Sequence, residues 1–512
     1  MSNTKTIARN TGWYGIETAI SSILTLFTSI AIARTLGPTK MGYLVYVTWI
    51  ANTVSNLGSL GIPSTTRKYM AEFLGMGDRG TARYIYLQTL MLQAILATLA
   101  TSGLVFWVLR DASPEYRLAS VLVVLSIWPA MVNAPSAQAN VAAEELARNL
   151  PASVIGISVF FLMILSTVVF HWGVVGVGAA MLTMRLVDFL VRGIPTLRRM
   201  LSWEKAHVQP EGLQKRMLTF AWQSVASMVV AVIVWDRSEF ILLKHLCADI
   251  RQVAYYSVAF SGAEWLLVSS TTFASAASAT IFAQYGRDKS RVPDITASTF
   301  RYLALTAIPL HFIAAALAAP ALLLVYGGAY SGAALVVTLT PLLCMPKAFI
   351  GPVQSLLQTH ERQSFVIIAT IVAGIIDIGV AWYFIPAHGA VGACIGSGAA
   401  QISAVGMMWI IGIILYKVKL PWKLLAKVAF ISALAALTAH YIATRLAPLW
   451  GILGGGCAAL IILFGLFYLM SVLKPEDRDR FNTLCRSLPR PIAGPVNSAL
   501  LFLIRPVPDS AA

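Results

Sequence analysis

Charged side chains inside long apolar segments are the residues of this sequence best able to do chemistry. They include Arg185, Asp188 and Arg192, then Asp236 and Arg237 beside Glu239, and Lys347 alone. A charge at the centre of a membrane-spanning helix costs at least about 2.5 kcal/mol, so it tends to face a cavity or a partner. Arginine binds anions through paired hydrogen bonds and lysine through a point charge, so these cations predict a site for an anionic group.

The same charges also have structural interpretations. Arg185 and Asp188 are three residues apart, so they share a helical face and can simply pair with each other. Arg192 stands near the end of its apolar segment, from which its head group can reach the membrane surface. Asp236 and Arg237 point about 100° apart on a helix, so either can neutralise a charge on a neighbouring helix.

Single charges in other apolar segments are further candidates. Lys347 follows Pro346 in mid-segment, where a broken helix often lines a cavity, and this favours a functional role. Glu264 stands in an apolar run beside Trp265. The isolated carboxylates, which either couple transport to a cation or are buried by neighbours, are Glu17 and Asp377.

Composition identifies the elements that must position these charges. Hydrophobic residues make up 58% of the chain and the mean hydropathy is +0.74, which indicates a membrane protein. About 20 apolar residues cross the hydrocarbon as a helix, and the apolar runs lack the period-two alternation of a barrel. We therefore predict an all-α polytopic membrane protein with about fourteen transmembrane helices, at 12–35, 43–66, 84–109, 118–143, 151–171, 174–197, 218–245, 254–283, 299–326, 333–358, 363–386, 390–416, 424–447 and 451–473.

The net charge of +16 does not predict a nucleic-acid partner. When the connections are assigned alternately to the two sides, most of the 38 Lys and Arg fall on one side, as the positive-inside rule requires of the cytoplasmic side. An even number of helices then places both termini in the cytoplasm.

The sequence lacks the motifs of several kinds of chemistry. There is no G-x-x-x-x-G-K-[ST] loop for ATP, and the five cysteines are too scattered to suggest a disulfide framework or a metal site. No connection on the outer side is long enough to carry catalytic groups as membrane glycosyltransferases or ligases do. We therefore expect no cofactor, no metal and no enzymatic activity.

The sequence contains an internal repeat. Residues 83–107 return at 301–325 with nine identities, and Pro129, Pro135 and Glu144 recur 217 positions later. Six helices separate corresponding elements, so both copies enter the membrane in the same sense and form two parallel six-helix pseudo-repeats. The expected domains are an N-terminal lobe at 1–200, a cytoplasmic linker at 201–217, a C-terminal lobe at 218–417, two additional helices at 418–473 and a cytoplasmic tail at 474–512. The tail is either amphipathic at the membrane surface or disordered.

A run of motifs resembles the polysaccharide-export flippases of the MATE-like MOP superfamily. An A-R-x-L-G-P turn and a later L-G-x-P segment carry the similarity, at Arg34, Leu36, Gly37, Pro38, Gly42, Leu60, Gly61 and Pro63. It continues through the Asp236–Arg237 pair and the segments at 253–259 and 326–330. The resemblance covers most of residues 10–475.

The resemblance implies a flippase that moves a lipid-linked oligosaccharide on a polyprenyl diphosphate across the bacterial cytoplasmic membrane. Two lobes would alternate access to a cationic cavity, for which the candidate substrate-binding residues are Arg237, Lys347, Arg185, Arg34, Asp236 and Glu264. Expected partners are the lipid-linked substrate, membrane lipids, and the polymerase and glycosyltransferases of the same pathway. A cation-coupled drug or small-molecule antiporter of the same superfamily is the alternative.

Overall fold

The computed structural model describes residues 2–205, 211–235, 238–473 and 477, with side chains from residue 24 onward except at 146 and at positions within 223–235 and 275–287. Every element in this part of the chain is helical. Two compact units are present, Met1–Ala254 and Tyr255–Ala512. We refer to them as unit 1 and unit 2; the lobe and linker boundaries expected from the sequence stay predictions.

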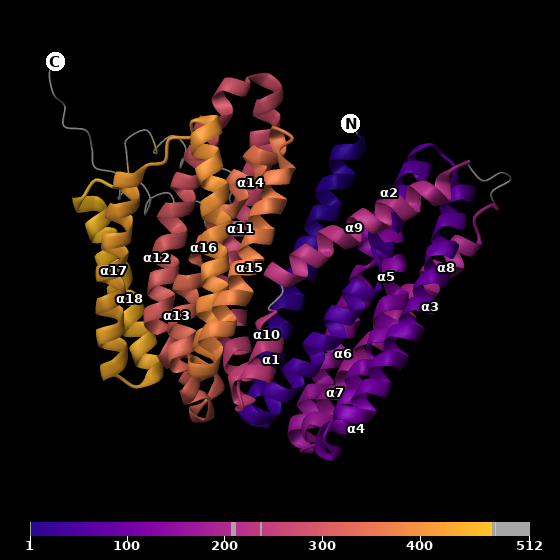
Figure 1. Cartoon of the computed structure of the whole chain (residues 1–512), viewed down its shortest axis with the longest axis horizontal. Helices are drawn as coiled ribbons and strands as arrows, with labels where there is room; N and C mark the ends of the chain where they lie inside the picture. Colours follow the sequence, from indigo (N-terminus) through magenta and orange to yellow (C-terminus); the bar gives the residue numbers. More distant parts are fainter. Residues whose placement is uncertain (1, 206–210, 236–237, 474–476, 478–512) are drawn as a thin grey trace. The chain divides into compact units, whose positions relative to one another are not determined.

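Unit 1 contains one very long helix followed by shorter ones (Figure 1). Its elements are α1 (Ser2–Gly58), α2 (Ile62–Gly75), α3 (Arg79–Asp111), α4 (Pro114–Leu125), α5 (Ile127–Ala142), η1 (Leu146–Arg148), α6 (Leu150–Val169), α7 (Gly173–Asp188), η2 (Phe189–Gly193), α8 (Ile194–Leu201), α9 (Leu213–Trp235) and α10 (Glu239–Leu246). Helix α7 packs on α4 and α6, and α5 packs on α2 and α3.

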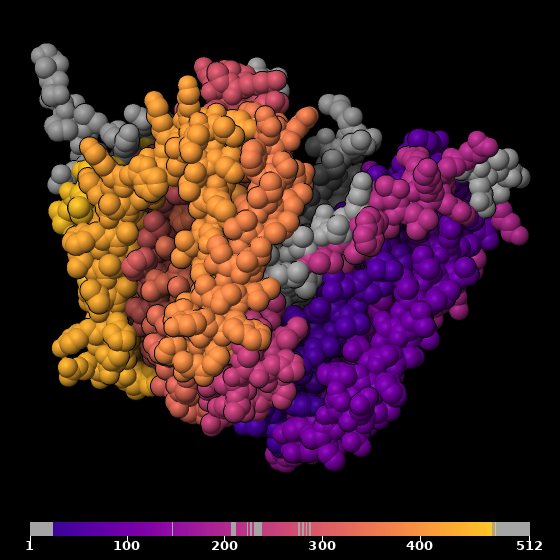
Figure 2. All heavy atoms as spheres, in the orientation of Figure 1, coloured from indigo at the N-terminus to yellow at the C-terminus, as the bar shows by residue number. Residues whose placement is uncertain are grey.

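Unit 2 begins within α11 and ends with a helical hairpin. Its elements are α11 (Arg251–Arg287), η3 (Lys289–Arg291), α12 (Val292–Tyr326), η4 (Gly328–Ala333), α13 (Ala334–Cys344), η5 (Met345–Phe349), α14 (Ile350–Thr359), α15 (Gln363–His388), α16 (Ala390–Tyr416), α17 (Trp422–Arg445) and α18 (Pro448–Leu469). Helices α17 and α18 pack on each other and on α12, and form the yellow face of this unit in Figure 2. Gly451 and Gly455 bring α18 against the backbone of α17, where a Cβ atom would lie 2.7 Å from a carbonyl oxygen.

Ten helical segments of the described residues are long and apolar enough to cross a membrane. They coincide with ten of the fourteen predicted spans, from 84–109 to 174–197 and from 299–326 to 451–473. The described residues of the other four predicted spans lie in α1, α2, α9, α10 and α11, apart from turns at 59–61 and 238. The all-helical membrane fold is therefore confirmed, and the count of fourteen stays a prediction.

Backbone geometry repeats at the displacement seen in the sequence. Glu144, just after α5, has φ 58° and Glu361, just after α14, has φ 57°, a left-handed conformation that is uncommon outside glycine. The next residue of each turn donates its N–H to a carbonyl five residues back, Glu145 to Asn140 and Arg362 to Leu357, both at 2.9 Å. Turns of the same geometry 217 residues apart support the two-fold repeat.

The A-R-x-L-G-P motif forms a kink. Gly37 adopts φ 69° inside α1 and Pro38 follows it, so two helices meet end to end there. The L-G-x-P motif forms a second break, where Gly61 at φ 70° precedes α2. A Cβ on Gly61 would lie 2.7 Å from the carbonyl oxygen of Ala221 in α9, so glycine permits both the turn and the close approach.

Candidate functional site

A helical irregularity positions the charges at the end of α7. Pro195 has no N–H, so it cannot donate to the carbonyl one turn before it. The chain widens into the π-helical turn η2, in which Ile194 donates its N–H to the carbonyl of Phe189, five residues back. Arg192 lies in this turn and Asp188 ends α7 just before it. The two side chains therefore lie on one side of the helix, four residues apart.

Asp188 is the anion of this region. Its Oδ1 lies 2.9 Å from Nη2 of Arg192, and its Oδ2 accepts a hydrogen bond of 2.8 Å from Asn133 of α5. Arg192 also donates to the hydroxyl of Ser153 in α6, at 2.9 Å. The Asp188 and Arg192 side chains are only 17% and 14% exposed, so the pair ties α5, α6 and α7 together inside unit 1.

Arg185 adds a second cation to the same face. It is half-buried and interacts electrostatically with both Asp188 and Arg192. The ion pair of Asp188 is made with Arg192, not with Arg185 as the spacing alone suggested, and Arg192 turns inward instead of toward the membrane surface. In the described part of the chain, Arg185 forms no ion pair with a carboxylate. We call the group of Asn133, Ser153, Arg185, Asp188 and Arg192 the Asp188 cluster.

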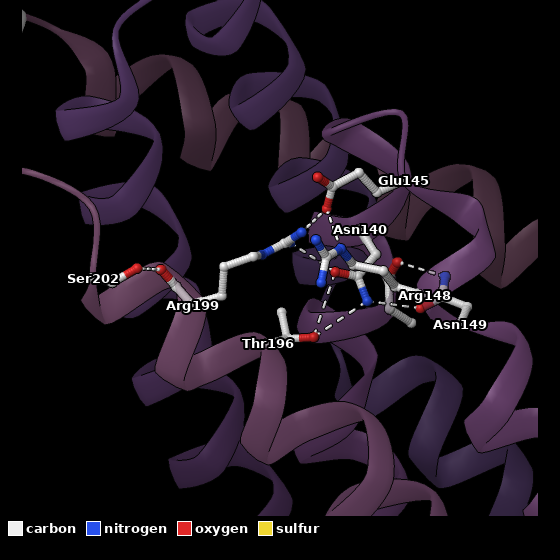
Figure 3. Close-up of polar contacts among 8 residues, drawn as sticks. Asn140, Glu145, Arg148, Asn149, Thr196, Arg199 and Ser202 are labelled. Carbon is white, nitrogen blue, oxygen red and sulfur yellow. Dashed lines mark hydrogen bonds and ion pairs between the residues drawn. The ribbon is translucent and has the colours of Figure 1, made fainter. Parts of the chain in front are cut away.

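A second polar group, the Asn140 cluster, continues the first one (Figure 3). It consists of Asn140, Glu145, Arg148, Asn149, Thr196 and Arg199. The Asn140 amide donates to Asn149 at 2.9 Å and to Thr196 at 3.2 Å, and its oxygen accepts from Arg199 at 2.8 Å. The Asn149 carbonyl accepts from Arg192 at 3.5 Å, which links the two clusters.

The Asn140 cluster also has more cations than anions. Glu145 forms ion pairs with both Arg148 and Arg199, which converge on its carboxylate in Figure 3. The two clusters together contain four guanidinium groups, from Arg148, Arg185, Arg192 and Arg199, and two carboxylates. Their net charge is therefore +2, although three of the four guanidinium groups form an ion pair with a carboxylate.

The broken helix predicted around Lys347 is present. The 3-10 turn η5 separates α13 from α14, with Pro346 in its first turn. Trp409 of α16 donates its indole N–H to the carbonyl of Phe349 at 3.0 Å, which satisfies an acceptor at the break. Phe300 packs against both rings, with centroids 4.8 Å and 4.7 Å away. Lys347 lies half-buried in this turn.

The described members of the predicted site lie on four elements. Arg34 is exposed on α1, three residues before its kink, and Arg185 lies in α7. In unit 2, Glu264 is exposed on α11 and Lys347 lies in η5. Asp236 and Arg237 lie outside the described residues. Around Arg185 the structure gathers a different set of residues, the Asp188 cluster, of which the sequence reasoning missed Asn133 and Ser153.

Comparison with known proteins identifies the family and the fold. The model of a family described as polysaccharide biosynthesis protein matches residues 7–285. A structure of the lipid II flippase MurJ in an inward closed conformation superposes with a TM-score of 0.69 at 14% identity, covering 89% of this chain and 98% of that one. An inward-facing MATE multidrug-resistance transporter of the MOP superfamily superposes with a TM-score of 0.64 at 16% identity, covering 78% and 94%.

The comparison with curated proteins found no match. The two structural neighbours share too little sequence to show more than a common fold. The family model, however, covers more than half of the 512 residues. The chain therefore belongs to the polysaccharide biosynthesis protein family and has the fold of the MOP superfamily of membrane transporters.

Proposed function

We propose that this protein is a flippase that moves a lipid-linked oligosaccharide, carried on a polyprenyl diphosphate, from the inner to the outer leaflet of the bacterial cytoplasmic membrane. Family membership supports a role in polysaccharide biosynthesis, and the fold supports transport rather than catalysis. A diphosphate with sugars cannot cross hydrocarbon unaided, whereas its polyprenyl tail is compatible with lipid. The protein must therefore offer the head group a polar, cationic route.

The observation that carries this proposal is the composition of the Asp188 cluster. Arg185 and Arg192 share one carboxylate, and the ion pair of that carboxylate is with Arg192. The guanidinium of Arg185 is only half-buried, and among the described residues no carboxylate of its own balances its charge. Such a group suits a diphosphate, because a phosphate accepts two parallel hydrogen bonds from one arginine. In this assignment Arg185 holds the diphosphate, and Asp188 positions the neighbouring guanidinium.

The other predicted substrate-binding residues stay part of the proposal. Lys347 stands in a helix break of the second repeat, where a point charge suits a phosphate that must also be released. Arg237, Asp236, Arg34 and Glu264 complete the proposed set. The two lobes would rock to expose the head-group site first to the cytoplasm and then to the outer side, while the tail stays in lipid. Both termini would lie in the cytoplasm, where glycosyltransferases supply the substrate.

A strain that lacks this protein tests the assignment. If the protein is the flippase, lipid-linked oligosaccharide accumulates on the cytoplasmic side and surface polysaccharide is lost. Wild-type protein should restore export, whereas the double variant Arg237→Ala/Lys347→Ala should insert into the membrane without restoring it. Unchanged lipid-linked sugars in the strain, together with greater sensitivity to cationic drugs, would instead indicate the antiporter. Full export by the double variant would refute the assignment of these two cations.

A further inference from the structure

Unit 1 contains a cavity of about 380 Å³ away from the residues assigned so far. Its walls come from α1 just after the Gly37 kink, from the last turn of α3, from the start of α4 and from the last turn of α10. Three chain segments that are far apart in sequence, 39–47, 107–116 and 244–250, therefore meet around it. A Cβ on Gly42 would clash with the carbonyl of Ile250, so the wall formed by α1 depends on glycine for its close packing.

The interior of this cavity is aromatic. Tyr43 of α1 and Tyr116 of α4 stack with ring centroids 4.4 Å apart and ring planes 25° apart. Ser120 donates its hydroxyl to the carbonyl of Tyr116 at 2.9 Å, and its oxygen lies 3.4 Å from the Tyr43 hydroxyl. Tyr46 and Trp107 complete the aromatic lining, the first buried and the second half-buried. Three tyrosines and one tryptophan thus offer flat apolar faces together with polar edges.

The rim of the cavity is polar and accessible. Asp111, Lys244 and His245 line it and are all exposed, as is Thr39. They supply a carboxylate acceptor, an ammonium donor, an imidazole and a hydroxyl, within reach of a ligand that lies against the aromatic rings. Because one carboxylate stands beside the lysine, the rim is not a dedicated anion site.

The position of the cavity along α3 relates it to the membrane. Helix α3 has 33 residues and runs from Arg79, at the basic end of the unit, to Asp111 at the cavity. At 1.5 Å per residue it is about 50 Å long, more than the roughly 30 Å of the hydrocarbon core. The basic end faces the cytoplasm by the positive-inside rule, so the cavity faces the outer side.

We infer that this cavity binds a sugar ring of the transported oligosaccharide as it reaches the outer side. The inference rests on the proposed function. A pyranose has an apolar C–H face that stacks on aromatic rings and peripheral hydroxyls that need both donors and acceptors, which matches this lining and rim. The volume lies within the roughly 300 to 1,000 Å³ of typical small-molecule sites. A polyprenyl tail would not use the polar rim, and a diphosphate would find no excess of cations there, because Asp111 offsets the charge of Lys244.

Saturation-transfer NMR on the full-length protein in detergent tests the site directly, because it reports which sugar protons lie close to the protein. The probes are methyl α-glucoside, N-acetylglucosamine and glucuronic acid, with sugar-free polyprenyl diphosphate as a separate arm. We expect transfer to the ring protons of at least one sugar. Trp107→Ala and Tyr116→Ala should weaken binding about tenfold. Tyr116→Phe, which keeps the ring, should retain it.

Matched variants separate the site from general effects. Tyr383→Ala removes a tyrosine of α15 that is 76% exposed and should leave the signal unchanged. The exposed rim variant Lys244→Ala should reduce binding without loss of folding, so the test does not depend on the aromatic variants being stable. The inference is overturned if no sugar gives transfer with the wild type, if the pocket variants bind as the wild type does, or if only the sugar-free diphosphate competes for the signal.

The same preparation, reconstituted in vesicles, distinguishes this inference from the proposed function. Sugar binding without translocation of a polyprenyl diphosphate oligosaccharide would uphold the pocket and refute the flippase. Translocation without sugar binding would uphold the flippase and refute the pocket.

Discussion

Replacing Asp188 with alanine tests the central polar cluster of unit 1. The carboxylate pairs with Arg192 at 2.9 Å and accepts from Asn133 at 2.8 Å, and both members of the ion pair are largely buried. Its loss leaves a guanidinium in the apolar bundle without its anion, which costs about 3 kcal/mol on insertion scales. The lost acceptor of Asn133 adds about 1 kcal/mol.

The hydrogen bond from Arg192 to Ser153 survives the substitution and offsets part of this cost. We therefore expect a net loss of about 3 kcal/mol. At roughly 2–4 °C per kcal/mol for a unit of this size, the midpoint of thermal unfolding in detergent should fall by about 6–12 °C. Asp188→Asn keeps an acceptor oxygen for Asn133, so its unfolding midpoint should lie between those of the wild type and Asp188→Ala.

A double-mutant cycle separates the ion pair from other effects of the substitution. Removing Arg192 as well, as Arg192→Leu, should recover part of the stability, with a coupling of at least about 1 kcal/mol. Asp249→Ala is the control, because its pair with Arg251 is exposed and contributes no more than about 1 kcal/mol. An unchanged midpoint for Asp188→Ala, or strictly additive effects in the cycle, would refute the reasoning.

Three further predictions concern stability, each measured by thermal unfolding. Gly37→Ala should lower the free energy of unfolding by about 1–2 kcal/mol, because alanine is strained at the φ of 69° found there. Gly61→Ala should lower it by at least about 1 kcal/mol more, because the added Cβ would also lie 2.7 Å from a carbonyl oxygen. Equal losses of stability in the two variants would contradict this. Asp78 caps α3 through the N–H of Thr81 at 2.9 Å, and the hydrogen bonds from Thr81 lower the pKa of its carboxyl. The cap therefore stabilises the protein above the unfolded pKa of about 3.9, and the effect is lost as the pH falls through the lower folded pKa. Asp78→Ala should accordingly lose about 1 kcal/mol at pH 7 and nothing in stronger acid, and a loss that does not depend on pH would contradict this. Asp477→Ala removes the carboxylate that accepts two hydrogen bonds from Arg301, at 2.8 and 2.6 Å, and should lower the free energy of unfolding by about 3 kcal/mol. A midpoint of thermal unfolding within about 1 °C of the wild type would contradict this prediction.

Much of the fold could be predicted because its signals are local or repeated. Apolar runs of helical length identify spans regardless of tertiary structure, since the bilayer imposes that length. The recurrence of Glu144 as Glu361 predicted the repeat, and both residues take the same left-handed turn. Pro346 predicted the helix break at η5 because proline removes a backbone donor wherever it stands.

The polar clusters were harder to predict because they depend on register. The π-helical turn η2 adds a residue to the helix, and Arg192 rather than Arg185 then pairs with Asp188. Pro195 was the available signal, since a proline just after a charged helix end often distorts it. The Asn140 cluster joins the end of α5 and the turn before α6 to α8, about 50 residues later, so no local spacing brings Thr196 and Arg199 to Asn140.

The most direct test of the account is the translocation of a fluorescent polyprenyl diphosphate oligosaccharide across vesicles that contain the purified protein. A membrane-impermeant quencher reports how much substrate reaches the outer leaflet. We predict that the wild type and Arg110→Gln, a control on the exposed end of α3, translocate the substrate, and that Arg185→Gln is at least about tenfold slower. Translocation no faster than in protein-free vesicles, or an unimpaired Arg185→Gln variant, would contradict the account.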